Sequence, residues 1–129
     1  MTADLVQFLR ARLDEDLEVA RLTLGPNVMA RVRHGHPVPR WVPSPEGDAG
    51  IWDSDGTPRV KFVWAQERDH IVRHDPARVL REVEAKRRII GRIDSHATVM
   101  GWDEVHGDLL RALALPYNDH PDYRPEWRP

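Results

Sequence analysis

The sequence predicts an α+β fold with a long N-terminal helix, a small antiparallel β-meander, two to three further helices and an extended C-terminal tail. Two observations support this prediction. Apolar residues recur at helical spacing near the N-terminus and again beyond residue 76, and prolines break the stretch between these regions. The chain has 129 residues, of which 40% are hydrophobic and 31% charged. This length and composition favour a single globular domain over residues 1–129.

Residues 1–25 are expected to form the N-terminal helix, running from Asp4 to Leu24. Leu5, Leu9 and Leu13 recur every four residues and therefore lie on one face. Gly25-Pro26 then ends the helix, because glycine is common just past a helix C-terminus and proline cannot continue the helix.

Residues 26–64 contain too many prolines for a long helix and are expected to form the β-meander. The candidate strands are Trp41-Val42, Ile51-Trp52 and Val60 to Trp64. Asp53-Ser54-Asp55-Gly56 is a typical tight-turn sequence, since glycine accepts a positive φ and aspartate bonds nearby amides.

Residues 65–115 are expected to be helical, with a short helix over Ala65–Arg73 leading into a long one. Asp75 can accept hydrogen bonds from the first free amides, and Pro76 stands where its missing N–H costs nothing. The long helix is predicted over residues 77–90, followed by an irregular stretch from Gly91 to Gly101. A third helix begins near Trp102 and ends before Pro116.

Residues 116–129 form a tail rich in proline and aromatic residues. Tyr117, Tyr123 and Trp127 are candidate contacts for a protein partner, because aromatic rings anchor an ordered segment with large buried area. The alternative, which we favour, is a strap that closes over its own domain, since an exposed aromatic tail promotes aggregation. Four tryptophans are expected in the core: Trp41, Trp52, Trp64 and Trp102.

The composition excludes several classes of site. There is no cysteine, and so no disulfide or thiolate metal site within this chain. No apolar run approaches the ~20 residues of a membrane span, and the N-terminus lacks the pattern of a secretion signal. We therefore expect a cytoplasmic protein without a membrane partner. The net charge of −2 does not favour non-specific binding to nucleic acid.

Several segments resemble a known family. They are Asp4-Leu-Val-Gln-Phe-Leu-Arg-Ala-Arg-Leu-Asp14, residues 70–90, Leu113-Ala-Leu-Pro-Tyr117, His120-Pro-Asp-Tyr-Arg124 and Glu126-Trp-Arg-Pro129. The chain resembles a family of small actinobacterial and actinophage proteins known only as a domain of unknown function. The resemblance implies a bacterial cytoplasmic protein, with an origin in mobile elements as one possibility. Relatives often have cysteines where this chain has residues 94–108 with His96 and His106, so a zinc site implied by those cysteines would be lost or rebuilt here.

A metal site is one alternative. His70 and His74 are spaced i, i+4 and would share a helix face, as two imidazole ligands of one metal do, with His120 as a third ligand if the tail folds back. Zinc is the metal that this alternative would bring; otherwise we expect no cofactor. The competing interpretation is that His74 packs at the helix junction and bonds a backbone group.

Nucleic-acid binding by the basic long helix is a further alternative, with Arg81, Arg88 and Arg92 as candidate phosphate contacts. Glu82 and Glu84 interrupt this basic face, and Glu84 can pair with Arg88 at i, i+4. We favour a solvated, self-paired helix. Arg87 lies near the apolar stripe and should extend its charge to solvent or meet a carboxylate.

No convergent set of catalytic side chains is evident in the sequence. The leading hypothesis is therefore a small non-enzymatic accessory or adaptor protein that binds a protein partner or a second copy of itself. The alternatives are a metal-binding domain, with or without hydrolytic activity, and a nucleic-acid-binding protein.

Overall fold

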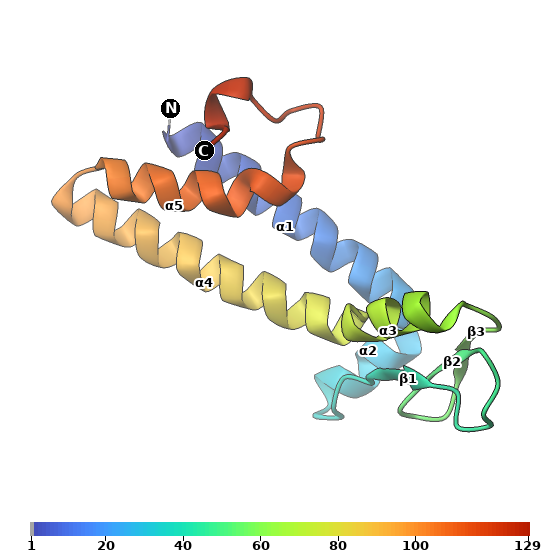
Figure 1. Cartoon of the computed structure of the whole chain (residues 1–129). Coiled ribbons are helices and arrows are strands. Elements are labelled where there is room, and N and C mark those ends of the chain that lie inside the picture. Colours follow the sequence, from blue (N-terminus) through green and yellow to red (C-terminus); the bar gives the residue numbers. More distant parts are fainter. Residues whose placement is uncertain (1) are drawn as a thin grey trace. The chain divides into compact units, whose positions relative to one another are not determined.

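The computed structural model describes residues 2–129 and confirms the α+β fold. The elements are α1 (Thr2–Leu24), α2 (Pro26–Arg33), β1 (Trp41–Pro43), β2 (Ile51–Asp53), β3 (Pro58–Val60), α3 (Ala65–Arg73), α4 (Pro76–Met100) and α5 (Glu104–Ala114), with 3₁₀ turns at Leu115–Tyr117 and Pro125–Trp127 (Figure 1). The chain divides into two compact units. We name them the terminal unit (residues 2–16 and 83–129) and the central unit (residues 17–82). The single domain stays a prediction.

The terminal unit is helical. It contains the first part of α1, most of α4, α5 and the tail, and α4 and α5 form an antiparallel hairpin (Figure 1). Its buried side chains include the apolar residues that recur at helical spacing in α1, α4 and α5: Leu5, Leu9, Leu13, Ile90 and Leu110. The sequence periodicity therefore identified the packed faces of these helices.

Helix α4 is longer than predicted, because the stretch expected to be irregular from Gly91 to Gly101 continues the helix to Met100. Gly91 is in open space and costs a helix only about 1 kcal/mol relative to alanine. The apolar stripe continues past it through the buried Ile93 and Ala97. The helix ends at Gly101, whose φ of 88° is the left-handed conformation typical of a helix terminus.

The central unit contains a three-stranded antiparallel sheet in the order β1-β2-β3, in which Trp41 faces Asp53 and Ile51 faces Val60. The third strand ends at Val60, so the prediction that it reaches Trp64 is wrong. The partner strand β2 begins at Ile51, which lies opposite Val60. Beyond this pair, the two segments are joined by a hydrogen bond from Val63 N–H to Ala49 O (2.9 Å).

Helix α2 was not predicted, because the density of prolines suggested strands and turns. Pro26 occupies the first turn of this helix, where a missing N–H leaves no hydrogen bond unmade. The next proline, Pro37, lies beyond the C-cap residue His34, so the eight residues of α2 fit before it.

Of the four tryptophans predicted in the core, two are exposed. Trp41 and Trp52 are half-buried in the sheet. Trp64 and Trp102 are 66% and 41% exposed, because Trp64 lies beyond the end of β3 and Trp102 lies in the turn between α4 and α5.

Candidate functional site

The start of α4 is built as the sequence predicts, and Asp75 is its key residue. Its buried carboxylate accepts a hydrogen bond from Arg78 N–H (2.9 Å), which caps the helix. The second oxygen accepts from Trp41 N–H (2.9 Å) in β1. Asp75 therefore joins the first turn of α4 to the edge of the sheet within the central unit.

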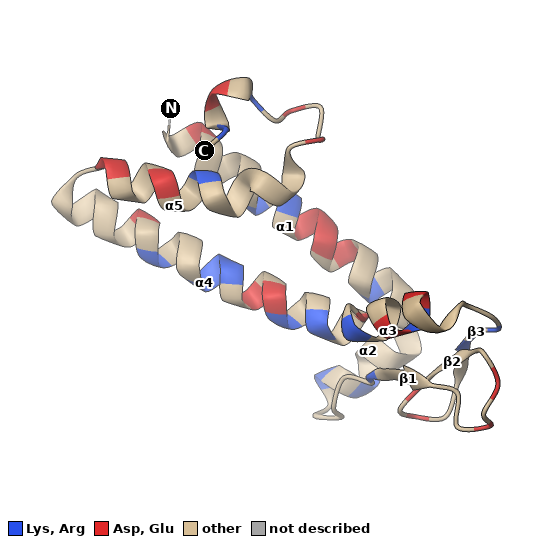
Figure 2. Cartoon of the chain, viewed as in Figure 1, with Lys and Arg blue, Asp and Glu red and all other residues tan. Residues whose placement is uncertain are grey.

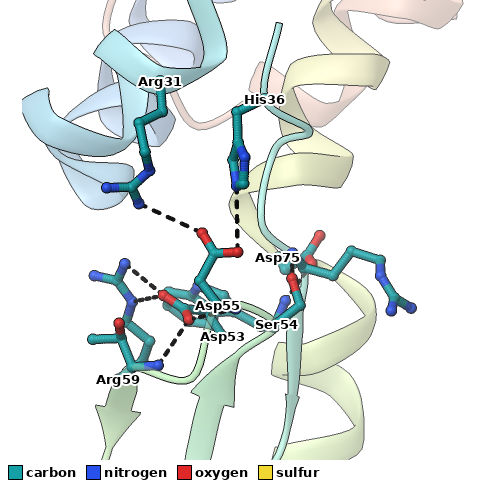
Figure 3. Close-up of polar contacts among 10 residues, drawn as sticks. Arg31, His36, Asp53, Ser54, Asp55, Arg59 and Asp75 are labelled. Carbon is teal, nitrogen blue, oxygen red and sulfur yellow. Dashed lines mark hydrogen bonds and ion pairs between the residues drawn. The ribbon is translucent and has the colours of Figure 1, made fainter.

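A second carboxylate cluster lies at the β2–β3 turn (Figure 3). The Asp53 side chain is 1% exposed. One of its oxygens accepts from the backbone N–H groups of Asp55 (3.0 Å) and Thr57 (2.9 Å), and the other from Arg59 Nε (2.9 Å) and Nη2 (2.8 Å). Burial alone would raise the pKa of Asp53, but the hydrogen bonds from Thr57, Arg59 and Asp55 outweigh it and hold that pKa below its ordinary value.

The neighbouring Asp55 faces α2 and the loop that follows it. Arg31 Nη2 and His36 Nε2 lie 3.5 and 3.4 Å from its two carboxylate oxygens (Figure 3). An Asp–His pair beside a serine suggests a hydrolase, but Ser54 Oγ accepts from Arg40 N–H (3.0 Å), and no hydrogen bond joins it to His36 within residues 2–129. The cluster therefore supports a structural role, in which it fixes the turn against α2.

The histidines of the predicted metal site lie in two different units. In the central unit the rings of His70 and His74 lie 4.5 Å apart, and His74 Nδ1 lies 2.9 Å from the backbone oxygen of His70, to which a protonated Nδ1 would donate. In the terminal unit His120 Nδ1 lies 3.0 Å from Arg12 Nη1. Among residues 2–129 no group of three potential ligands is placed to hold a metal ion. His74 bonds a backbone group, as the competing interpretation expects, but it is exposed and not packed at the junction. The zinc site stays a prediction without geometric support.

The aromatic residues of the tail pack around Phe8 of α1, within the terminal unit. Ring centroids of Tyr117, Tyr123 and Trp127 lie 6.4, 6.0 and 5.0 Å from that of Phe8. Trp127 is only 5% exposed. This is the arrangement of the predicted strap, and it leaves little of Trp127 for a partner. Binding of another protein by these residues stays a prediction.

Two polar contacts, which were not predicted from the sequence, also hold the tail against α1. The Tyr117 hydroxyl donates to Asp16 Oδ2 (2.6 Å). The buried Arg12 lies over the Phe8 ring (4.9 Å) and reaches Glu15 (2.9 Å) and His120. A buried arginine within an apolar stripe was the available signal, because such a residue needs a partner from elsewhere in the chain.

The basic residues of α4 are partly neutralised by neighbours (Figure 2). Arg88 pairs with Glu84 (2.8 Å), and Arg87 reaches Asp14 of α1, as its position near the apolar stripe predicted. Arg81 and Arg92 are exposed. Nucleic-acid binding through Arg81, Arg88 and Arg92 stays a prediction, and the pairing of Arg88 weakens its electrostatic basis.

The α4–α5 hairpin contains a groove that the sequence did not reveal. The cavity, of about 350 Å³, is lined by Arg92, Ile93, His96, Asp103, Val105, His106 and Leu109. Within this lining His96 Nδ1 and His106 Nε2 lie 2.8 Å apart, and His106 is buried. His106 also completes a capping box with Asp103 at the start of α5. The spacing Asp103-x-x-His106 was the available signal for this cap.

The exposed aromatic surface of the central unit consists of Phe62 and Trp64. Phe62 is 58% and Trp64 66% exposed, and their rings stack edge to face at 5.2 Å. They lie directly before α3, where Gln66, Glu67, His70 and Ile71 line an open groove. Large exposed aromatic side chains are typical of protein-binding surfaces.

Fold and surface together define a small, mostly helical α+β protein that presents apolar surfaces. None of the helices formed by residues 2–129 is long and apolar enough to cross a membrane. The chain belongs to DUF6221, a family of unknown function, whose model matches residues 2–129. No curated protein and no solved structure matches the chain.

Proposed function

We propose that this protein is a non-enzymatic adaptor of the bacterial cytoplasm that binds a protein partner through Phe62 and Trp64. The observation that carries this proposal is the exposure of two aromatic rings in edge-to-face contact. Burying an aromatic side chain in an interface removes roughly 150–250 Å² from water, and tryptophan is among the residues most enriched in binding hot spots. The actinobacterial or phage origin implied by the sequence resemblance belongs to the same proposal.

The surroundings of the two rings favour a protein over a nucleic acid. Lys61 and Glu67, close to the aromatic pair in the sequence, carry opposite charges. The guanidinium of Arg59 is already paired with the carboxylate of Asp53. A surface that stacks nucleic-acid bases combines aromatic rings with a consistently positive groove. The mixed charge here is better suited to the polar rim of a protein interface.

The proposal is tested with the double variant Phe62→Ser/Trp64→Ser and the matched control Leu22→Ser, which removes another exposed apolar side chain of the central unit. Each purified protein is used to capture partners from an actinobacterial lysate, and the captured protein is then purified and titrated by calorimetry. We expect the wild type and the control to bind equally and the double variant to bind at least about tenfold more weakly.

Thermal melting separates binding from folding in this experiment. Because both rings are exposed, the double variant should lower the free energy of unfolding by no more than about 0.5 kcal/mol. Serine at position 64, the N-cap of α3, can instead raise it by about 1 kcal/mol. Equal binding of the captured protein by the double variant and the wild type would refute the proposed surface. If the captured protein also binds the Leu22→Ser variant more weakly, its binding is not specific for the surface formed by Phe62 and Trp64.

A further inference from the structure

The outer face of the α4–α5 hairpin carries several exposed apolar side chains within the terminal unit. Val105 (63% exposed) and the exposed Leu109 line its groove from α5. Helix α4 adds three exposed apolar side chains, Ile89, Val99 and Met100. Each lies three or four residues along α4 from a groove residue, Arg92, Ile93 or His96, and therefore lies on the same face of the helix. Contiguous apolar patches of this kind mark interaction surfaces.

The two charged side chains that line the groove have opposite signs and lie toward its two ends. Asp103 stands at the turn that opens α5, and its side chain is more than half exposed. Arg92 lies eight residues before the end of α4, about 12 Å away along the helix. No hydrogen bond or ion pair joins the Arg92 side chain to another residue of the described chain, 2–129. Between these ends the groove is apolar except for the histidine pair.

A surface with a positive end, an apolar middle and a negative end is complementary to itself. In a two-fold symmetric dimer the same patch meets on both subunits, and each residue of a contacting pair occurs twice. A rotation axis through the middle of the groove brings Arg92 of each copy to Asp103 of the other and covers Val105 and Leu109. The Arg92 guanidinium then gains an ion pair, the Asp103 carboxylate gains a contact beside its helix-capping hydrogen bond, and the apolar patch is removed from water.

We infer that the α4–α5 face is the seam of a homodimer, with a second copy of this chain as its occupant. This inference concerns a different surface from Phe62 and Trp64 and does not depend on the adaptor function.

Reciprocal charge variants test the inference. Arg92→Asp gives a groove with two acidic ends, and Asp103→Arg gives one with two basic ends. In sedimentation velocity over a micromolar to submillimolar series, we expect the wild type to reach twice its monomer mass of 14.9 kDa. Each charge variant alone should dimerise at least about tenfold more weakly, and an equimolar mixture of the two should recover dimerisation by forming a heterodimer.

Two controls make the experiment decisive. Arg21→Asp changes the same charge on an exposed position of α1 and should dimerise like the wild type. Leu109→Asp should abolish dimerisation while leaving the circular dichroism spectrum unchanged, because Leu109 is exposed in the monomer. A wild type that stays monomeric throughout the series, as expected if an unrelated protein covers this face, would overturn the inference. So would a mixture that dimerises no better than its components.

Discussion

Replacing Asp53 by asparagine tests how the β2–β3 turn is held. The substitution keeps the shape of the side chain but removes its charge and turns one oxygen into an NH2 group. The new side chain can still accept from the amides of Asp55 and Thr57 through its remaining oxygen. Its NH2 group then faces Arg59, which has only donors to offer.

The loss follows from the two hydrogen bonds that Arg59 makes to Asp53. Hydrogen bonds to charged groups contribute about 1.5–3 kcal/mol each. The Arg59 side chain is 22% exposed, so water can solvate part of the abandoned guanidinium and reduce the loss. We expect the free energy of unfolding to fall by about 2–4 kcal/mol, which lowers Tm by roughly 10 °C in a chain of this size.

The pKa of Asp53 predicts how this difference depends on pH. Because the folded pKa is lowered, the carboxylate contributes its full stability above its unfolded pKa of about 3.9 and loses it as the pH falls through the lower folded value. The gap in unfolding free energy between wild type and Asp53→Asn should therefore be constant from pH 7 to about 5. It should narrow below about pH 4.

Urea unfolding of both proteins at several pH values measures this gap, and Asp55→Asn is the matched control. The contacts of Asp55 are long, 3.4 and 3.5 Å, and both partners are well exposed, so its loss should cost less than about 1 kcal/mol. Equal losses for the two variants, or a gap that widens as the pH falls, would refute this account of the turn.

Three further variants address other parts of the fold. Trp127→Ala should lower the free energy of unfolding by about 3–5 kcal/mol in urea titrations, because it removes a buried ring packed on Phe8; a loss under about 1 kcal/mol would mean that the tail is not a strap. Asp75→Ala should cost about 2–4 kcal/mol by the same measurement, since it leaves two backbone amides without their acceptor, and Asp75→Asn should recover part of this. Asp103→Ala should cost about 1 kcal/mol in thermal melts and lower helicity slightly; an unchanged Tm would argue against the capping box of α5.

The features of the fold that the sequence predicts are those set by local chemistry. Asp75-Pro76 identifies a helix start because a side-chain acceptor and a missing N–H act within one turn. The apolar spacing identified the buried faces of α1, α4 and α5 for a similar reason. The length of α4 was underestimated because an isolated glycine was treated as a helix breaker. The buried Ile90 before Gly91 and Ile93 after it stabilise the helix by more than the glycine costs.

The contacts between distant segments could not be predicted from the sequence. Arg12 meets His120 across more than a hundred residues, and His106 meets His96 from the opposite helix of a hairpin. The sequence pattern shows that such side chains need partners but does not show which ones. The exposure of Trp64 was missed in the same way, because it depends on where β3 loses its neighbour and not on the alternation of its own residues.

The two oxygens of Asp75 bind amides from different elements, one in a strand and one in a helix. When the carboxylate moves away, the Trp41 amide and the Arg78 amide lose their acceptor together and both become exposed. Hydrogen–deuterium exchange at these two positions should therefore proceed through a common opening, so that the edge of the sheet and the first turn of α4 unfold as one cooperative group.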